Sequence, residues 1–114
     1  MKLGEIVNVY NVLGEAKTST LKVEEVLNIL RVRKVMRPHV EEWNAFYRDV
    51  QEKIQQWEDM SEEQRKEVNK SIEAELAKDI EVEFEKLSEE GIAALIQENG
   101  FKVREIDLLG IMKE

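Results

Sequence analysis

Positive charge concentrates at one place in this chain, the run from Arg31 to Arg37. Its four cations, Arg31, Arg33, Lys34 and Arg37, could grip phosphates or an acidic protein surface. Spread around a helix with no aromatic platform among them, they are a weak footprint for nucleic acid. We therefore expect this basic run to pair with the chain's own acidic half or with a partner protein rather than with nucleic acid.

A row of carboxylates near residue 80 could bind a hard cation. Its members are Asp79, Glu81, Glu83 and Glu85, which project from one face if this segment is a strand. Calcium sites need ligands that converge from a curved loop, whereas a straight row diverges. We therefore expect a solvated acidic face, whose repulsion also discourages edge-to-edge aggregation.

Catalytic constellations are missing from the sequence. His39 is the only histidine and, beside Pro38 on a charged helix, is not a dependable member of a Ser-His-Asp triad. There is no cysteine, which excludes thiol nucleophiles and zinc-thiolate sites. The five glycines are scattered and form no phosphate-binding loop. These observations predict a protein that is not an enzyme and that has no cofactor or metal, and the lack of cysteine fits a reducing compartment.

The charge of the chain is divided unevenly. Residues 1–57 carry a net charge of +1 and residues 58–114 a net charge of −9, which makes the carboxyl half a poor surface for a phosphate backbone. No stretch approaches ~18 consecutive apolar residues, and Glu5 interrupts the amino terminus where a secretory signal would stay apolar. We expect a soluble, unprocessed, cytoplasmic protein that does not enter a membrane.

A heptad seam runs through the first half of the chain. Ten positions at alternating three- and four-residue spacing form it, namely Val26, Ile29, Arg33, Met36, Val40, Trp43, Tyr47, Val50, Ile54 and Trp57. Such a seam predicts one long helix over residues 20–58, about 55 Å at ~1.5 Å per residue, that lies against other helices. Ser19 or Thr20 could cap it. Pro38 interrupts the seam without changing its phase, which favours a kink over a break.

Shorter elements flank the predicted long helix. An apolar stripe over residues 3–13 predicts a short first helix. Ser61 and Gln64 form a capping box, so a helix should begin at Ser61 and run to about Lys78. Because few residues separate Trp57 from Ser61, this helix should return beside the long one as an antiparallel hairpin.

The carboxyl-terminal part has a mixed pattern. Period-two alternation predicts a strand over residues 79–85, and Ser88 and Gly100 should bound a short helix. Residues 101–103 offer a second strand, and residues 106–112 a last amphipathic turn or two. The predicted fold is mainly α (α+β) in one domain, residues 1–114, with a helical hairpin region (1–78) and a small two-strand and helix appendage (79–114).

The seam also supplies a candidate interaction surface. It consists of the seam residues Arg33, Met36, Trp43, Tyr47 and Trp57, together with Phe46 immediately beside the seam. Aromatic stripes at helical spacing are more often core than binding site, but this chain has few helices with which to cover so long a seam. We expect self-association or a helical protein partner here. Arg33, the one charge on the seam, should reach solvent or meet Glu67 or Glu73 on the returning helix.

The order of elements resembles that of a family of short, uncharacterised proteins encoded by bacteriophages and prophages. The resemblance rests on the start of the long helix at Leu21-Lys22, the acidic alternation over residues 79–85 and the Leu-rich segment over residues 106–112. Pro38 and the two tryptophans depart from that pattern. The resemblance implies a small phage protein expressed with virion or assembly genes, and it supplies no catalytic residues.

These observations together predict a non-enzymatic helical module for protein–protein interaction, used as a phage structural or assembly accessory in the host cytoplasm or in the virion. The alternative is an acidic regulator or inhibitor, either a mimic of nucleic acid acting through residues 79–90 or an antitoxin-like protein.

Overall fold

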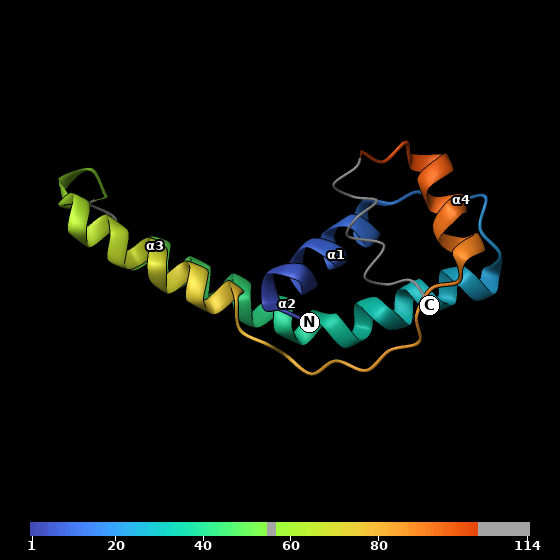
Figure 1. Cartoon of the computed structure of the whole chain (residues 1–114), viewed down its shortest axis with the longest axis horizontal. Helices are drawn as coiled ribbons and strands as arrows, with labels where there is room; N and C mark the ends of the chain where they lie inside the picture. Colours follow the sequence, from blue (N-terminus) through green and yellow to red (C-terminus); the bar gives the residue numbers. More distant parts are fainter. Residues whose placement is uncertain (55–56, 103–114) are drawn as a thin grey trace.

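The computed structural model of the chain describes residues 1–54 and 57–102 and is mainly helical (Figure 1). Its elements in chain order are α1 (Leu3–Glu15), α2 (Val23–Lys53), the short 3-10 turn η1 (Trp57–Asp59), α3 (Glu62–Leu76) and α4 (Glu89–Asn99). The prediction of a mainly α fold built on one long helix is confirmed. The predicted turn over residues 106–112 lies outside the described residues.

The long helix α2 is shorter than the seam that predicted it. It begins at Val23, where the carboxylate of Glu25 accepts a hydrogen bond from the backbone N–H of the N-cap residue Lys22 at 3.3 Å. Ser19 and Thr20, the expected caps, lie upstream of this start. Pro38 sits inside the helix without ending it, so the predicted continuity across the proline is confirmed.

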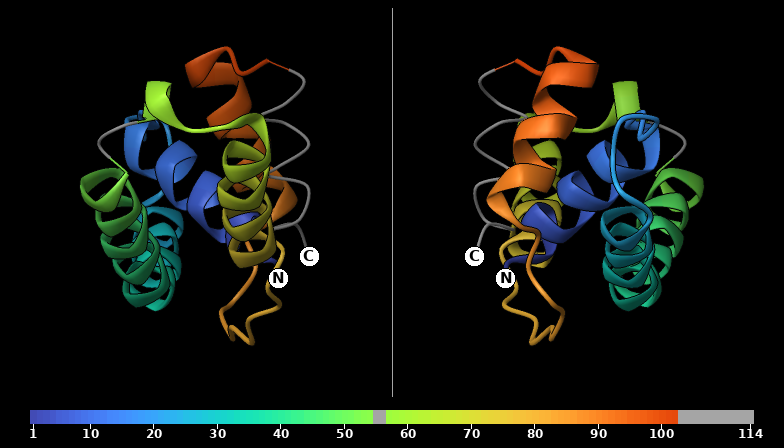
Figure 2. Two further views of the ribbon diagram at one scale, coloured as in Figure 1. Left: turned by 90° about the vertical axis from the view of Figure 1, so that its left-hand side faces the viewer. Right: turned by 90° about the vertical axis from the view of Figure 1, so that its right-hand side faces the viewer.

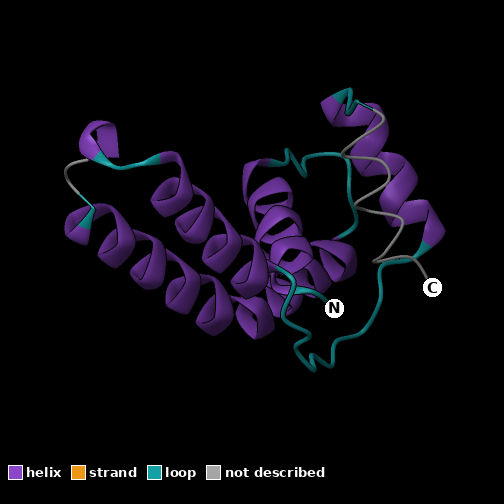
Figure 3. Cartoon of the chain, turned by 60° about the vertical axis from the view of Figure 1, so that its left-hand side comes forward, coloured by secondary structure: helices purple, strands orange, loops and turns teal. Residues whose placement is uncertain are grey.

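Helix α3 begins where its capping box predicts. Ser61 Oγ accepts from the backbone N–H of Gln64 at 3.2 Å, and the Gln64 side chain accepts from the N–H of Ser61 at 3.0 Å. Figures 1 and 3 show α3 returning alongside the second half of α2. We call these paired parts, with η1 between them, the distal arm (residues 41–76). The arm projects away from α1 and α4, and the molecule measures 52 × 27 × 20 Å.

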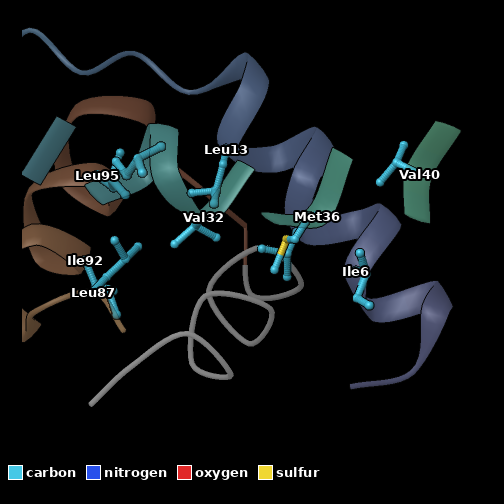
Figure 4. Packing of buried hydrophobic residues seen from close by; sticks show 10 residues of the cluster. Ile6, Leu13, Val32, Met36, Val40, Leu87, Ile92 and Leu95 are labelled. Atoms are coloured by element: carbon cyan, nitrogen blue, oxygen red, sulfur yellow. The ribbon is translucent and has the colours of Figure 1, made fainter. Parts of the chain in front are cut away.

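The core lies at the opposite end of the molecule, where α1 and α4 cover the first half of α2 (Figure 2). Its buried apolar members are Ile6, Val9, Leu13, Ile29, Val32, Met36, Val40, Leu87, Ile92 and Leu95. Figure 4 shows Leu13 facing Val32, with Leu87, Ile92 and Leu95 gathered at the α4 end. Residues 80–101 thus contribute to the same core as α1 and α2 and are not an appendage to a finished hairpin.

The predicted strand over residues 79–85 is wrong. Hydrogen bonds join only its start to the amino terminus, with the N–H of Ile80 donating to the carbonyl of Met1 at 2.8 Å and the N–H of Leu3 donating to that of Lys78 at 2.9 Å. The rest of the segment is extended and forms no ladder within the part of the chain that the structure describes. The alternation still decides which side chains face the core. Ile80, Val82 and Phe84 pack against it, while the glutamates between them are exposed.

Phe101 and Lys102, at the start of the second predicted strand, are likewise not in a strand, and Val103 lies outside the described residues. Helix α4 itself is as predicted. Ser88 Oγ accepts from the N–H of Gly91 at 3.0 Å, and Gly100 ends the helix at a φ of +58°, a left-handed conformation that glycine adopts without steric cost.

Two polar side chains at the end of α4 hold the loop between α1 and α2. The carboxylate of Glu98 accepts hydrogen bonds from the backbone N–H groups of Ser19 and Thr20 at 3.0 and 3.1 Å, and from both hydroxyls. Asn99 exchanges two hydrogen bonds with the backbone of Lys17, at 2.7 and 2.9 Å. Ser19 and Thr20 therefore bind α4, which corrects their expected role as caps of the long helix. We call this set of contacts the loop clasp.

Candidate functional site

The two halves of the heptad seam have different surroundings. In the first half, α1 and α4 cover Ile29, Met36 and Val40. Met36 is 0% exposed and therefore belongs to the core, so its place in the candidate interaction surface is wrong. The apolar stripe that enters this core also passes through Val32, which is off the heptad seam, rather than through Arg33.

Arg33 turns toward α1. Its guanidinium carbon lies 4.2 Å from the centre of the Tyr10 ring, a cation–π contact, and its Nε is buried without a hydrogen-bond partner. Gly14 makes room for it, because a Cβ at that position would lie 2.7 Å from Arg33 Nη2. The expected ion pair with Glu67 or Glu73 is not formed, since Arg33 packs on α1 and not on α3.

The other cations of the basic run are exposed. Arg37 also interacts with Tyr10, and a hydrogen bond to that side chain, aided by its Coulombic attraction, raises the pKa of the Arg37 guanidinium above its ordinary value. Arg31 lines a pocket of about 440 Å³ that Glu85 and Glu90 also line, at the start of α2. No salt bridge joins the basic run to a carboxylate within residues 1–54 and 57–102, so the expected pairing with the chain's own acidic half is not made there.

Aromatic residues occupy the part of the seam that enters the distal arm. The Trp43 ring lies 5.8 Å from that of Phe46 and 5.6 Å from that of Tyr47, measured between ring centres. Trp43 and Phe46 are half-buried, whereas Tyr47 is 42% exposed. These three candidates are therefore brought together into one cluster on α2.

Trp57 lies at the tip of the arm, in η1. The prediction that it belongs to the long helix is therefore wrong. The Arg65 guanidinium sits 5.6 Å from the centre of its ring and donates hydrogen bonds to the carbonyls of Trp57 and Glu58, each at 2.9 Å. Arg65 thereby ties η1 to the start of α3. The Trp57 side chain remains 37% exposed.

An uncharged groove runs between the arm helices. It has a volume of about 310 Å³, and its lining residues are Tyr47, Val50, Gln51, Ile54, Trp57, Val68, Asn69 and Ile72. Apolar side chains dominate this lining, and the polar groups of Gln51, Asn69, Tyr47 and Trp57 can supply hydrogen bonds. This composition is suited to an inserted side chain. The groove is thus a largely apolar surface between the described arm helices that remains open.

The residues weighed for catalysis or metal binding stay apart. Glu81, Glu83 and Glu85 are exposed, and no cluster of three or more potential metal ligands occurs among the residues that the structure places. Ser88 Oγ donates to Glu25 at 3.3 Å, a contact that sequence spacing could not reveal because 63 residues separate the pair. His39 lies half-buried on α2, away from this contact.

Sequence reasoning missed one apolar feature of α2. Val23, Leu27 and Leu30 are 74%, 44% and 52% exposed, and they share one face of the helix. Their spacing of four and three residues is visible in the sequence. The neighbouring seam has the same period and is longer, so the helical pattern was assigned to the seam alone.

Comparisons with protein-family models, with curated proteins and with solved structures find no match for this chain. None of the helices described in residues 1–54 and 57–102 is both long and apolar enough to cross a membrane.

Proposed function

We propose that this protein is a non-enzymatic module for protein–protein interaction and that it binds a helical partner through the distal arm. The observation that supports this most is the uncharged groove beside Tyr47 and Trp57, both more than a third exposed. Exposed aromatic residues beside an apolar groove are typical anchors of protein interfaces, because they bury a large area for little conformational entropy.

The position of the groove also supports the proposal. The arm projects from the core, so a partner helix can lie along it without meeting α1 or α4 (Figure 1). Tyr47 and Trp57 are exposed and are not members of the buried core cluster, which leaves them free to serve binding. Tyr47 and Trp57 together would contribute the larger part of the binding free energy, as interface aromatics commonly do.

The experiment is a selection of displayed helical peptides on the wild-type protein, with counter-selection on the Tyr47→Asp variant. Selected peptides should carry apolar residues at helical spacing and should bind Tyr47→Asp at least ~10-fold more weakly, because the new charge is desolvated in the groove. Glu52→Ala, an exposed change elsewhere on the arm, is the matched control and should leave affinity unchanged.

Light scattering over a concentration series complements the selection. A dimer that dissociates on Tyr47→Asp would identify a second copy as the occupant of the groove. If the protein stays monomeric and selected peptides bind both proteins equally, the arm is not a binding surface. A hydrolase and phosphotransfer screen should be blank, and activity lost on His39→Ala would overturn the non-enzymatic part of the proposal.

The resemblance to short phage and prophage proteins supports a narrower proposal, that the partner belongs to a virion or its assembly machinery. Genomic neighbourhood tests this directly. Adjacent capsid, portal or tail genes would support it.

The exposed row of Glu81, Glu83 and Glu85 supports the alternative, an acidic regulator that imitates nucleic acid. They lie about 7 Å apart along an extended chain and so form a regular row of negative charge, as a phosphate backbone does. An adjacent nuclease or toxin gene, together with inhibition lost on Glu83→Lys, would favour this alternative over the arm.

A further inference from the structure

The first half of α2 presents an apolar stripe that residues 1–54 and 57–102 leave exposed. Val23, Leu27 and Leu30 lie at helical spacing on one face and are 74%, 44% and 52% exposed. Isolated exposed apolar residues need no explanation, but three aligned on one helix face form the ridge on which another helix packs.

Cations continue the same face toward the middle of α2. Lys34 follows Leu30 by one turn, and Arg31 and Arg37 flank it. All three side chains are exposed, and none forms a salt bridge with a carboxylate that the structure describes. Near Arg37 lie Tyr10 of α1 and Glu41 of α2 itself. The pocket that Arg31 lines is also lined by Glu24 and Glu25 of α2, by Glu85 and Glu90, and by Lys22 and Lys86.

We infer that this combined face binds an acidic amphipathic helix of a partner protein. We call it the acidic-helix surface, and it consists of Val23, Leu27, Leu30, Arg31, Lys34 and Arg37. Its apolar part would pack against apolar residues of the partner, while its cations would meet carboxylates about two turns further along. From Val23 to Arg37 it spans ~21 Å, the length of about four helical turns.

Charge complementarity favours this occupant over the others. Residues 23–40 carry a net charge of +2 within a chain of net charge −8, so an acidic partner is attracted to this place and repelled elsewhere. Nucleic acid would meet the same repulsion and would leave the apolar stripe in water. The distal arm, residues 41–76, carries a net charge of −6 and would therefore repel an acidic partner.

The acidic-helix surface is separate from the groove of the distal arm. Figure 1 places the start of α2 beneath α4, at the end of the molecule opposite the arm. One chain could therefore hold two partners at once, and loss of one site should leave the other intact.

The test uses the whole protein and a matched pair of designed helical peptides. Both peptides carry leucines along one face, and they differ only in that the flanking residues are all glutamate in one and all lysine in the other. Fluorescence anisotropy should give saturable binding of the glutamate peptide that weakens as salt is added, and binding of the lysine peptide at least ~10-fold weaker.

Charge reversal provides the decisive comparison. Lys34→Glu should weaken the glutamate peptide at least ~10-fold and strengthen the lysine peptide, and Leu27→Ser should weaken both. Tyr47→Asp, on the distal arm, should change neither affinity, which separates this inference from the proposed function. Circular dichroism should show that each variant keeps its helix content, because the altered side chains are exposed.

Two outcomes would overturn the inference. One is equal binding of both peptides by the wild-type protein, which would mean that the apolar stripe binds without selecting the charge of its partner. The other is binding of duplex DNA that competes with the glutamate peptide and is lost on Lys34→Glu but not on Leu27→Ser, which would make the cations a nucleic-acid site.

Discussion

Replacing Met36 by alanine should destabilise this protein strongly, because Met36 is a core residue and not a surface one. Its side chain is 0% exposed and lies between α1 and α2 in the main apolar cluster. Truncation removes three buried heavy atoms, which at about 0.8 kcal/mol each corresponds to ~2.4 kcal/mol of transfer free energy. The cavity left behind adds to this loss, so we expect a total near 3 kcal/mol, within the ~2–5 kcal/mol found for such truncations.

Urea denaturation followed by circular dichroism at the helix band measures this change. The midpoint should fall while the dependence of the unfolding free energy on urea stays constant, since the surface exposed on unfolding is the same. In a thermal scan the melting temperature should drop by roughly 10 °C.

Two controls separate a packing effect from a general sensitivity of α2. Met36→Leu preserves volume and should cost less than about 1.5 kcal/mol. Leu30→Ala truncates a side chain that is 52% exposed on the same helix and should cost less than about 1 kcal/mol. If Met36→Ala costs no more than Leu30→Ala, the residue is not packed in a core and the arrangement of α1 over α2 is wrong.

Three further changes should affect stability in defined directions. Pro38→Ala should raise the free energy of unfolding by about 1–3 kcal/mol, measured in urea, because proline inside a helix removes a hydrogen bond and strains the preceding turn. Gly100→Ala should lower it by about 1 kcal/mol, because φ is +58° there and alanine disfavours that region. Hydrogen bonds from Ser19 and then Thr20 lower the pKa of Glu98 from 4.5 to about 2. The carboxylate therefore contributes its full stabilisation above pH 4.5 and loses it as the pH falls toward 2. Glu98→Gln should accordingly weaken the dependence of the free energy of unfolding on pH between 4.5 and 2.

Each of these predictions has its own control. A fall in stability on Pro38→Ala would mean that the proline shapes the helix for packing. Gly100→Asn should cost less than Gly100→Ala, since asparagine tolerates left-handed backbone. Glu83→Gln, at an exposed carboxylate, should leave the free energy of unfolding below pH 4.5 unchanged. An equal effect of Glu98→Gln and Glu83→Gln would contradict the stabilising role of the loop clasp.

Local features of this fold were predictable because each rests on residues within a few positions of one another. Ser61 with Gln64, Ser88 with Gly91, and Gly100 after α4 define helix ends through contacts of three or four residues. The alternation over residues 80–84 likewise set which side chains face the core. Periodicity also identified the long helix, since the seam and the core stripe share Ile29, Met36 and Val40.

Contacts between distant residues decided the rest, and periodicity says nothing about them. The seam does not indicate which part of it α1 covers. Met36 was therefore expected in the interaction surface, and Arg33 either at the solvent or beside an acid of the returning helix. A row of alternating residues becomes a strand only if another strand pairs with it, and the described chain pairs only its start. Ser19 and Thr20 bind Glu98 across 79 and 78 residues, instead of capping the helix that follows them. A polar side chain takes the partner that the folded backbone brings within reach, and that partner is set by the packing of the whole chain.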